Sequence, residues 1–217
     1  MDYTVARQNM VESQLRTNKV NSVELLKAYE EVPRETFVPK HLKDVAYADT
    51  ELKIAEGRYL LQPMVQALLM QAAEIRPHDV VLEIGCGSGY ATSILAKLAN
   101  TVVALEENKA LSEIATENLG GLGIDNAVVV SGPLIEGYQK QSPYNVIFLS
   151  GAVSKVQEGL VSQLSDRGRL VTVVKSEGIF GKGVLISKFG NTVSYNEIFD
   201  AGSCVLPGFE TSPAFSF

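Results

Sequence analysis

Several residue types are scarce in this chain of 217 residues, and each scarcity excludes a kind of site. The two cysteines, Cys86 and Cys204, do not form the C-x-x-C spacing of a zinc site. The only histidines are His41 and His78, and both are flanked by polar residues. This scarcity argues against a histidine metal centre and against a catalytic triad built on histidine, so we expect no metal.

Long apolar runs and blocks of positive charge are also missing. No apolar run approaches the roughly 20 residues that span a bilayer, and the polar start at residues 1–8 does not resemble a signal peptide. The formal net charge is −6 and no run is rich in lysine or arginine, which disfavours binding to a nucleic-acid backbone. We therefore expect a soluble, cytoplasmic protein with neither a membrane nor a nucleic acid as partner.

The composition that remains is that of a globular protein, with 46% hydrophobic and 20% charged residues. No internal repeat, linker or low-complexity tract divides the chain, so we predict one domain over residues 1–217. Within it, residues 1–78 form a helical and irregular N-terminal cap, and residues 79–217 form a sheet core.

The cap begins with a predicted helical stretch at residues 4–30, in which Asn21 and Glu24 resemble an N-cap and its N3 partner. Residues 33–62 lack a clean period and hold Pro33, Pro39 and Gly57, with Pro63 directly after them, so they are interpreted as an irregular covering segment. Pro63 stands where a helix can begin.

From residue 79 onward, short apolar runs alternate with helical stretches. This alternation predicts a parallel sheet covered on both faces. The expected strands are 79–84, 101–105, 127–130, 144–149 and 168–174, and the expected helices are 89–98, 108–119 and 155–164. Residues 183–189 and 192–200 flank a Gly190-Asn191 turn and predict an antiparallel hairpin, and the tail from Leu206 is expected to be loop. The predicted fold class is α/β: a Rossmann-like, mostly parallel, doubly wound sheet with an antiparallel C-terminal strand pair and an N-terminal helical extension.

The first strand of this core ends in the most informative stretch of the chain. Glu83 is followed by three glycines at alternate positions, Gly85, Gly87 and Gly89. Such a turn leaves the backbone bare, so a flat ligand can lie directly on it. Glu106 closes the next apolar run, about where a ribose-binding carboxylate is expected after such a loop. The pair predicts a nucleoside cofactor.

The glycine spacing distinguishes between cofactors. A dinucleotide fold needs glycine at relative position 6, and here that residue is Tyr90, for which we favour packing beneath the turn. The alternate-glycine form resembles the S-adenosylmethionine loop of class I methyltransferases. An ammonium group on that cofactor suits Glu83, and its ribose hydroxyls suit Glu106. The resemblance assigns cofactor binding to Glu83, Gly85, Cys86, Gly87, Ser88, Gly89, Glu106, Gly132, Gln62 and Pro63.

Blocks ahead of the loop resemble the protein-L-isoaspartate O-methyltransferase family. They are Met-Val-Glu-Ser-Gln-Leu-Arg at 10–16, Val-Pro-Arg-Glu-Thr-Phe-Val-Pro at 32–39, Ala-Tyr-Ala-Asp at 46–49 and Gln-Pro at 62–63. The resemblance runs from about residue 7 to about residue 209. It implies methyl transfer from S-adenosylmethionine to the free carboxylate of isoaspartyl residues in damaged proteins or peptides, whose ester then collapses to a succinimide.

The chain departs from the family pattern at the methyl-transfer site. Leu61 stands at the position of the family serine, and Pro133 follows Gly132 where the family has an acid. The family's Pro-Val-Gly after strand 168–174 is missing. Asp49 borders the substrate cleft in the family, but it also suits a solvated loop or a helix cap. Leu61 and Asp49 are the catalytic-site candidates, and three functions stay open: the repair methyltransferase, a methyltransferase of this fold with another acceptor, and a non-catalytic cofactor-binding protein.

Overall fold

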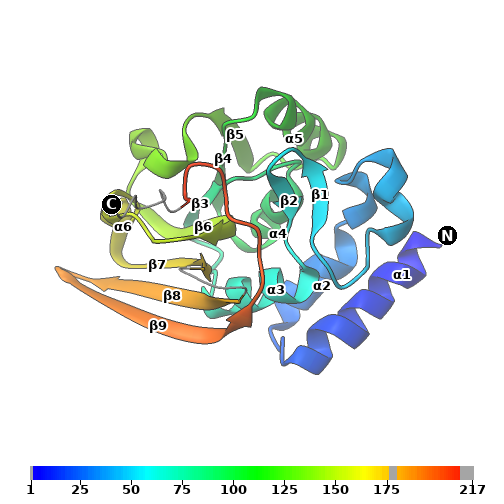
Figure 1. Cartoon of the computed structure of the whole chain (residues 1–217), viewed down its shortest axis with the longest axis horizontal. Helices are drawn as coiled ribbons and strands as arrows, with labels where there is room; N and C mark the ends of the chain where they lie inside the picture. The colour runs from blue at the N-terminus through cyan, green and yellow to red at the C-terminus, as the bar shows by residue number, and fades with distance from the viewer. Residues whose placement is uncertain (1, 176–179, 211–217) are drawn as a thin grey trace, which may run out of the picture.

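A seven-stranded sheet with the order β5-β4-β3-β6-β7-β8-β9 forms the centre of the protein (Figure 1). The computed structural model describes residues 2–175 and 180–210. Strands β3 to β7 are parallel to one another, and β8 and β9 join antiparallel at one edge. The strands are β3 Val80–Ile84, β4 Thr101–Glu106, β5 Ala127–Ser131, β6 Tyr144–Val153, β7 Leu164–Val174, β8 Gly181–Phe189 and β9 Thr192–Ala201. The predicted fold class is confirmed.

Helices pack against the sheet and against one another. α3 contacts β7 and β8, α4 and α5 contact β4 and β5, and α6 contacts β7. The helices are α1 Tyr3–Met10, α2 Val23–Glu31, α3 Pro63–Ala72, α4 Tyr90–Leu98, α5 Lys109–Gly121 and α6 Glu158–Ser162. A π-turn over Val11–Leu15 follows α1, and single 3₁₀ segments occupy Arg16–Asn18, Arg34–Thr36, Lys40–Val45, Leu134–Glu136 and Gln139–Gln141.

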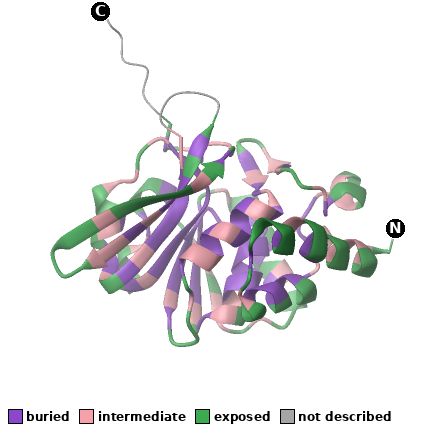
Figure 2. Ribbon diagram, turned by 90° about the horizontal axis from the view of Figure 1, so that it is seen from below, coloured by how far each residue is buried: buried purple, intermediate pink, exposed green. Residues whose placement is uncertain are grey.

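The core consists mainly of two apolar layers, one on each face of the sheet. Residues that are neighbours across the strands share a face: Val81, Val102 and Val146 on one, and Leu82, Val103 and Ile147 on the other. The first layer packs against the N-terminal helices and the second against α6 and the C-terminal residues Leu206 and Phe209. Figure 2 shows the buried residues concentrated in the central strands and the exposed ones along β9. Continuous apolar strands are thus explained by burial on both faces.

The N-terminal helical extension is interrupted where the sequence suggested one stretch. Lys19 has a left-handed backbone conformation, with φ of 65°, and it ends the first helical segment. The second helix, α2, is capped by Ser22, whose hydroxyl accepts a hydrogen bond from the Leu25 amide at 3.3 Å. The expected cap at Asn21 is therefore wrong by one residue. The amides of Asn21 and Ser22 both donate to the side chain of Gln71, which ties the start of α2 to α3.

The covering segment 33–62 is more regular than expected. It contains a β-hairpin, with β1 at Leu52–Ala55 antiparallel to β2 at Arg58–Leu60. The hairpin lies over the carboxyl ends of the central strands, between α5 and the N-terminal helices in Figure 1. The interpretation of this stretch as wholly irregular is wrong, and the hairpin is what carries residues toward the glycine loop.

The remaining differences concern ends of elements. The helix expected at 155–164 is only α6, Glu158–Ser162, because β7 already begins at Leu164. The tail after Leu206 is not a plain surface loop: Leu206 and Phe209 are buried, and the Leu206 amide donates to the Ala152 carbonyl at 2.8 Å. The last part of the expected tail, residues 211–217, lies outside the described residues, as does Ser176 after β7. The Pro63 helix start and the hairpin at Gly190-Asn191 are confirmed.

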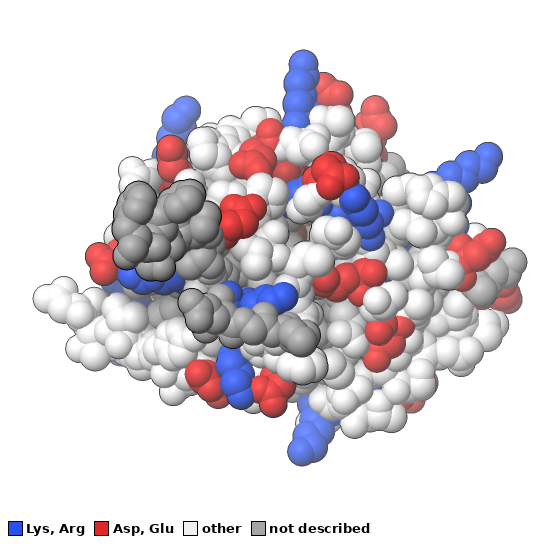
Figure 3. Space-filling view, viewed as in Figure 1, with Lys and Arg blue, Asp and Glu red and all other residues white. Residues whose placement is uncertain are grey.

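Charges are spread over the surface. Figure 3 shows basic side chains dispersed among acidic ones on the face of Figure 1. Within residues 2–175 and 180–210, no helix combines the length and the apolar character needed to cross a membrane.

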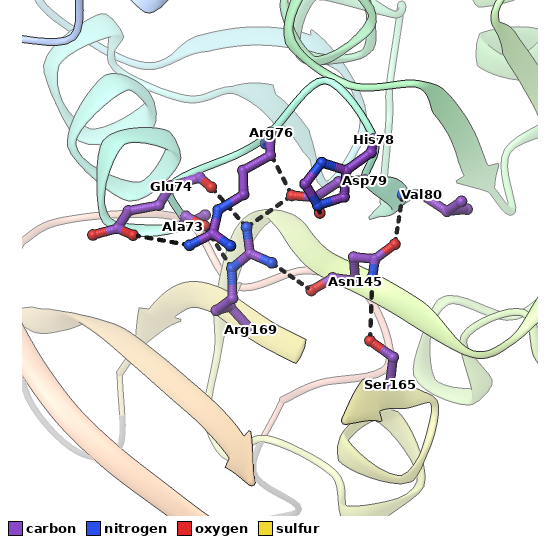
Figure 4. A network of polar contacts seen from close by, with 9 residues as sticks. All are labelled: Ala73, Glu74, Arg76, His78, Asp79, Val80, Asn145, Ser165 and Arg169. Atoms are coloured by element: carbon purple, nitrogen blue, oxygen red, sulfur yellow. Dashed lines mark hydrogen bonds and ion pairs between the residues drawn. The ribbon is translucent and has the colours of Figure 1, made fainter. Parts of the chain in front are cut away.

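A polar network lies at the amino ends of β3 and β6, at the end of the sheet opposite the glycine loop (Figure 4). Arg169 on β7 forms an ion pair with buried Asp79 at 2.8 Å and donates to the carbonyls of Ala73, Glu74 and Asn145. These carbonyls end α3 and begin β6, so one guanidinium joins α3, β3, β6 and β7. The side chain of Asn145, the second residue of β6, accepts from the Val80 amide at 2.9 Å.

We predict that Arg169→Met lowers the free energy of unfolding by about 3 kcal/mol, because it leaves Asp79 as an unpaired buried charge. The value is at the low end for such pairs because the Arg169 side chain is still 15% exposed. Lys182→Met is the control: it breaks an exposed pair with Asp200 and should cost less than 1 kcal/mol. Urea unfolding of the three proteins measures the difference, and equal losses in the two variants would contradict the assignment.

Candidate functional site

The candidate site lies at the carboxyl ends of β3 and β4, where the glycine loop turns from β3 into α4. The amides of Gly85 and Cys86 both donate to the Leu105 carbonyl, at 2.8 and 3.1 Å, which fixes the loop against β4. Gly85 and Gly87 have φ of 79° and 57°, a conformation that L side chains rarely adopt. The loop therefore presents bare backbone to whatever lies above it.

Glu106 ends β4 beside this loop and is fully buried. One carboxylate oxygen accepts from the amides of Glu107 and Asn108, each at 3.1 Å. The other accepts from the Gly87 amide and from the Arg58 guanidinium, each at 2.7 Å. A carboxylate has about four acceptor positions, so all of them are used.

Three side chains cover the loop. A Cβ on Gly85 would lie 2.9 Å from the Arg58 guanidinium and 3.0 Å from the Leu206 side chain. A Cβ on Gly87 would lie 2.7 Å from the Ile54 side chain. Ile54 and Arg58 come from the hairpin and Leu206 from the C-terminal segment, and we call these three residues the loop cover.

The two parts of the loop cover are tied to each other. The hydroxyl of Ser203 donates to the Glu51 carboxylate at 2.6 Å, and the Cys204 amide donates to the same carboxylate at 3.1 Å. Glu51 directly precedes β1, so this contact joins the hairpin to the C-terminal segment. The loop cover therefore consists of chain segments about 150 residues apart that are held as one layer.

Glu83 lies at the other side of the loop, fully buried within the sheet. Its two oxygens accept from the hydroxyls of Thr92 and Ser150, both at 2.6 Å. Burial raises the pKa of Glu83 from its ordinary value of 4.5 to about 7, although the two hydroxyl donors oppose this shift. Two acceptor positions stay open for the expected ammonium group, whose binding to Glu83 remains a prediction. The Ser150 hydroxyl donates its proton to Glu83, so this proton is not available to a ligand.

The small residues of the loop face the protein rather than the ligand side. Ser88 is buried and donates to the Phe37 carbonyl at 2.6 Å, which joins the loop to the N-terminal cap. The Cys86 thiol is buried, and burial raises its pKa, so it is an unreactive filler. Tyr90 packs beneath the turn, with the Arg34 guanidinium 4.7 Å from its ring centre, as its position suggested.

The catalytic-site candidates Leu61 and Asp49 lie in two segments that hydrogen bonds of Arg34 and Gln62 link. The buried Arg34 donates to the carbonyls of Leu61 and Ala46, each at 2.8 Å, so it joins the two family blocks around residues 46–49 and 61–63. Gln62 donates to the carboxylate of exposed Asp49 at 2.9 Å. Leu61 itself is buried, with 2% of its surface exposed.

Gly132 lies past the end of β5, where its amide donates to the Glu106 carbonyl at 3.4 Å. Pro133 after it is exposed and opens a single 3₁₀ turn. A pocket of about 640 Å³ begins at Ser131, Gly132 and Pro133 and extends to Tyr138. Of the predicted cofactor residues, only Gly132 lines this pocket, and its contact with Glu106 links the pocket to the end of β4 beside the glycine loop.

Arg58 is a candidate site residue that the motifs did not assign. Its sequence context gave little signal, because the stretch Ile54-Ala55-Glu56-Gly57-Arg58-Tyr59-Leu60-Leu61 holds two charged residues and does not show which of them is buried. A buried arginine in such a stretch needs a carboxylate partner. What the sequence could not supply is that this partner is Glu106, 48 residues away.

Comparison with known proteins identifies the family. A family model described as Protein-L-isoaspartate(D-aspartate) O-methyltransferase matches residues 6–196. The chain belongs to this family. Protein-L-isoaspartate O-methyltransferase of Methanoculleus marisnigri is 41% identical over 168 residues, which is 77% of this chain and 76% of that protein. The relative from Petrotoga mobilis is 39% identical over 177 residues, 81% of this chain and 83% of that protein.

Solved structures agree with this assignment. A protein-L-isoaspartate O-methyltransferase superposes with a TM-score of 0.82 at 27% identity, covering 93% of this chain and 66% of that one. A putative member from Plasmodium falciparum, solved in complex with S-adenosyl-L-homocysteine, has a TM-score of 0.78 at 21% identity, covering 92% of this chain and 97% of that one, and it supports the fold alone. The expected family and enzyme class are confirmed: this is an S-adenosylmethionine-dependent O-methyltransferase.

The residues present fit that cofactor on one condition. The bare backbone at Gly85 and Gly87 and the carboxylate of Glu106 are the groups that a nucleoside with ribose hydroxyls needs. Glu106 has no free acceptor position while Arg58 is bound to it. A ribose hydroxyl would therefore reach Glu106 only in exchange for one of its four present donors.

We predict that Glu83 makes stability depend on pH. Because the pKa of Glu83 is raised to about 7, its contribution to the free energy of unfolding is fully present below pH 4.5. This contribution is lost as the pH rises from 4.5 through 7. Glu83→Gln removes the titration, so the free energy of unfolding of wild type relative to this variant should fall by about 2–3 kcal/mol between pH 5 and pH 8. Urea unfolding of both proteins across this range measures the change, and a constant difference would refute the assignment.

Proposed function

We propose that this protein transfers a methyl group from S-adenosylmethionine to the free carboxylate of isoaspartyl residues in damaged proteins and peptides. The observation that carries the proposal is the family match over residues 6–196, which includes both the glycine loop and the N-terminal blocks. The geometry supports it, because Arg34 holds the blocks around Ala46 and Leu61 together.

The reaction asks for alignment rather than for acid or base chemistry. The cofactor supplies an activated methyl group, and the acceptor carboxylate is already ionised at neutral pH. Correct alignment of two bound partners can contribute about 7–11 kcal/mol to lowering the barrier. The apolar side chains of Ile54, Leu61 and Leu206 would keep water away from the acceptor, and Glu106 would hold the ribose. We further propose that Gly85, Gly87 and Gly132 take part in binding the cofactor.

Leu61 supports a second candidate function. It places a buried apolar side chain where the family serine would donate a hydrogen bond to the acceptor. A methyltransferase of this fold with a different carboxylate or small-molecule acceptor would not need that donor. The two candidates share the cofactor and differ only in the acceptor.

The decisive experiment measures transfer of labelled methyl groups to an isoaspartyl peptide, with the matching aspartyl peptide as control. We expect label only in the isoaspartyl peptide. If S-adenosylhomocysteine binds in calorimetry but neither peptide is labelled, the acceptor assignment fails and the second candidate stands. If neither binding nor labelling is observed, the chain is not a methyltransferase under these conditions.

We predict that Leu61→Ser raises kcat/KM for the isoaspartyl peptide by about tenfold, since a hydrogen bond to a charged group is worth about 1.5–3 kcal/mol. Leu60→Ser is the matched control because Leu60 is also buried but belongs to β2 and pairs with Leu52. Both variants lose apolar burial, so both are assayed below their melting temperatures. An equal or lower kcat/KM in Leu61→Ser than in wild type would remove Leu61 from the methyl-transfer site.

A further inference from the structure

Arg58 is a buried cation in the middle of the candidate site. Only 3% of its side chain is exposed, and one of its terminal nitrogens, Nη2, binds the Glu106 carboxylate at 2.7 Å. The guanidinium lies directly over Gly85, with Nη2 and Nη1 at 2.9 and 3.2 Å from the point where a Cβ would be. Arg58 therefore fills the space that the glycine leaves free above the loop.

The hydrogen bonds of this ion pair are unbalanced. The charges cancel, but Nε and Nη1 of Arg58 are buried and have no hydrogen-bond partner among residues 2–175 and 180–210. On the other side, Glu106 already accepts from three amides and from Arg58 and has no acceptor position left. The guanidinium thus has unused donors, and the carboxylate beside it cannot take them.

The comparison with Arg169 shows that a buried ion pair of this protein need not leave donors unused. Among the described residues, Arg34 also leaves one buried nitrogen, Nη1, without a partner, whereas Arg58 leaves two. Arg169 also pairs with a buried carboxylate, that of Asp79, but its nitrogens donate to three carbonyls besides. Every nitrogen of Arg169 has an acceptor, as expected for a purely structural ion pair. Arg58 lacks such acceptors, and its unpaired nitrogens lie next to the bare backbone of the cofactor loop.

We propose that Arg58 is the carboxylate-binding residue of this site and that it changes partner when ligands bind. The cofactor's ribose hydroxyls take the place of the guanidinium on Glu106, and the guanidinium turns to a carboxylate of a ligand. The inference rests on the proposed function, because both ligands of that reaction carry a carboxylate. One is on the amino-acid end of the cofactor and the other is the isoaspartyl acceptor.

The chemistry of the two groups supports this exchange. A guanidinium can hold a carboxylate through two parallel hydrogen bonds, which fixes orientation as well as position. A ligand carboxylate would replace the charge of Glu106 and would also occupy donors that are now unpaired. Arg58 also lies three residues before Leu61, so it offers a donor close in the chain to the position where the family serine is missing.

The test uses two ligands that differ in the carboxylate. S-adenosylhomocysteine carries the amino-acid end, and 5′-methylthioadenosine has the same nucleoside without it. Their affinities are measured by calorimetry for wild type, Arg58→Gln and Arg58→Lys, and KM is measured for the isoaspartyl peptide. Arg169→Gln is the matched control, since it breaks a buried ion pair at the opposite end of the strands. The ligand affinities and the KM of this control variant should stay within twofold of wild type.

Two results would support the proposal, and they distinguish the source of the carboxylate. If Arg58 binds the cofactor, Arg58→Gln weakens S-adenosylhomocysteine at least tenfold and leaves 5′-methylthioadenosine unchanged or tighter. If Arg58 binds the acceptor, the affinity for S-adenosylhomocysteine is kept and the peptide KM rises at least tenfold. Arg58→Lys should restore part of the loss, because it keeps the charge but not the two-pronged geometry.

The proposal is overturned if neither the ratio of the two nucleoside affinities nor the peptide KM changes more than twofold. Arg58 would then be only a counter-ion for Glu106. Should Arg58→Gln fail to fold in a thermal melt, Arg58→Lys, which keeps the buried charge, decides the same comparison. Failure of the proposed function is seen separately, as wild-type protein that binds S-adenosylhomocysteine but methylates no isoaspartyl peptide; the nucleoside comparison still applies then.

Discussion

The buried carboxylate of Glu106 is the point on which the arrangement of the site depends. It accepts hydrogen bonds from the start of α5, from the glycine loop and from the hairpin. Each of these is a different chain segment, and none of them is fixed by apolar packing alone. Because all four acceptor positions are filled, a change at any one partner alters the contacts available to the others. The proposed ligand binding at this carboxylate would therefore be an exchange of partners and not an addition.

The loop cover links the glycine loop to two further segments, the β1–β2 hairpin and the C-terminal segment. Ile54, Arg58 and Leu206 lie on the glycines, and the contact of Glu51 with Ser203 holds the two covering segments in one layer. The apolar side chains of this layer exclude water, whereas Arg58 introduces a charge within it. The same layer that shields the cofactor loop thus also holds the group that can recognise an anionic ligand.

The sheet core could be predicted from the sequence because its signals are local. Buried parallel strands appear as apolar runs. The glycines at 85, 87 and 89, together with Glu106 after the next run, predict which end of the sheet faces the cofactor. The hairpin at 52–60 could not be predicted in this way, since strands of three and four residues have no readable period and depend on the layer beneath them. The same holds for the site. The glycine loop could be predicted from its motif, but partners of Glu83 and Glu106 such as Ser150 and Arg58 come from distant segments and could not. The cap of α2 is Ser22 and not Asn21, a shift of one residue between two adjacent residues that both favour helix starts.

The hydrogen bond from Ser88 to the Phe37 carbonyl bears on how such enzymes can diversify. It connects the N-terminal cap, which carries the proposed acceptor-side residues Leu61 and Asp49, to the proposed cofactor loop. Acceptor choice and cofactor geometry are consequently not independent modules of this chain. A natural recombination event or a laboratory chimera that exchanges the cap would have to bring matching contacts at Ser88 and Glu106 with it, because a cap from a relative without them would disturb the cofactor loop.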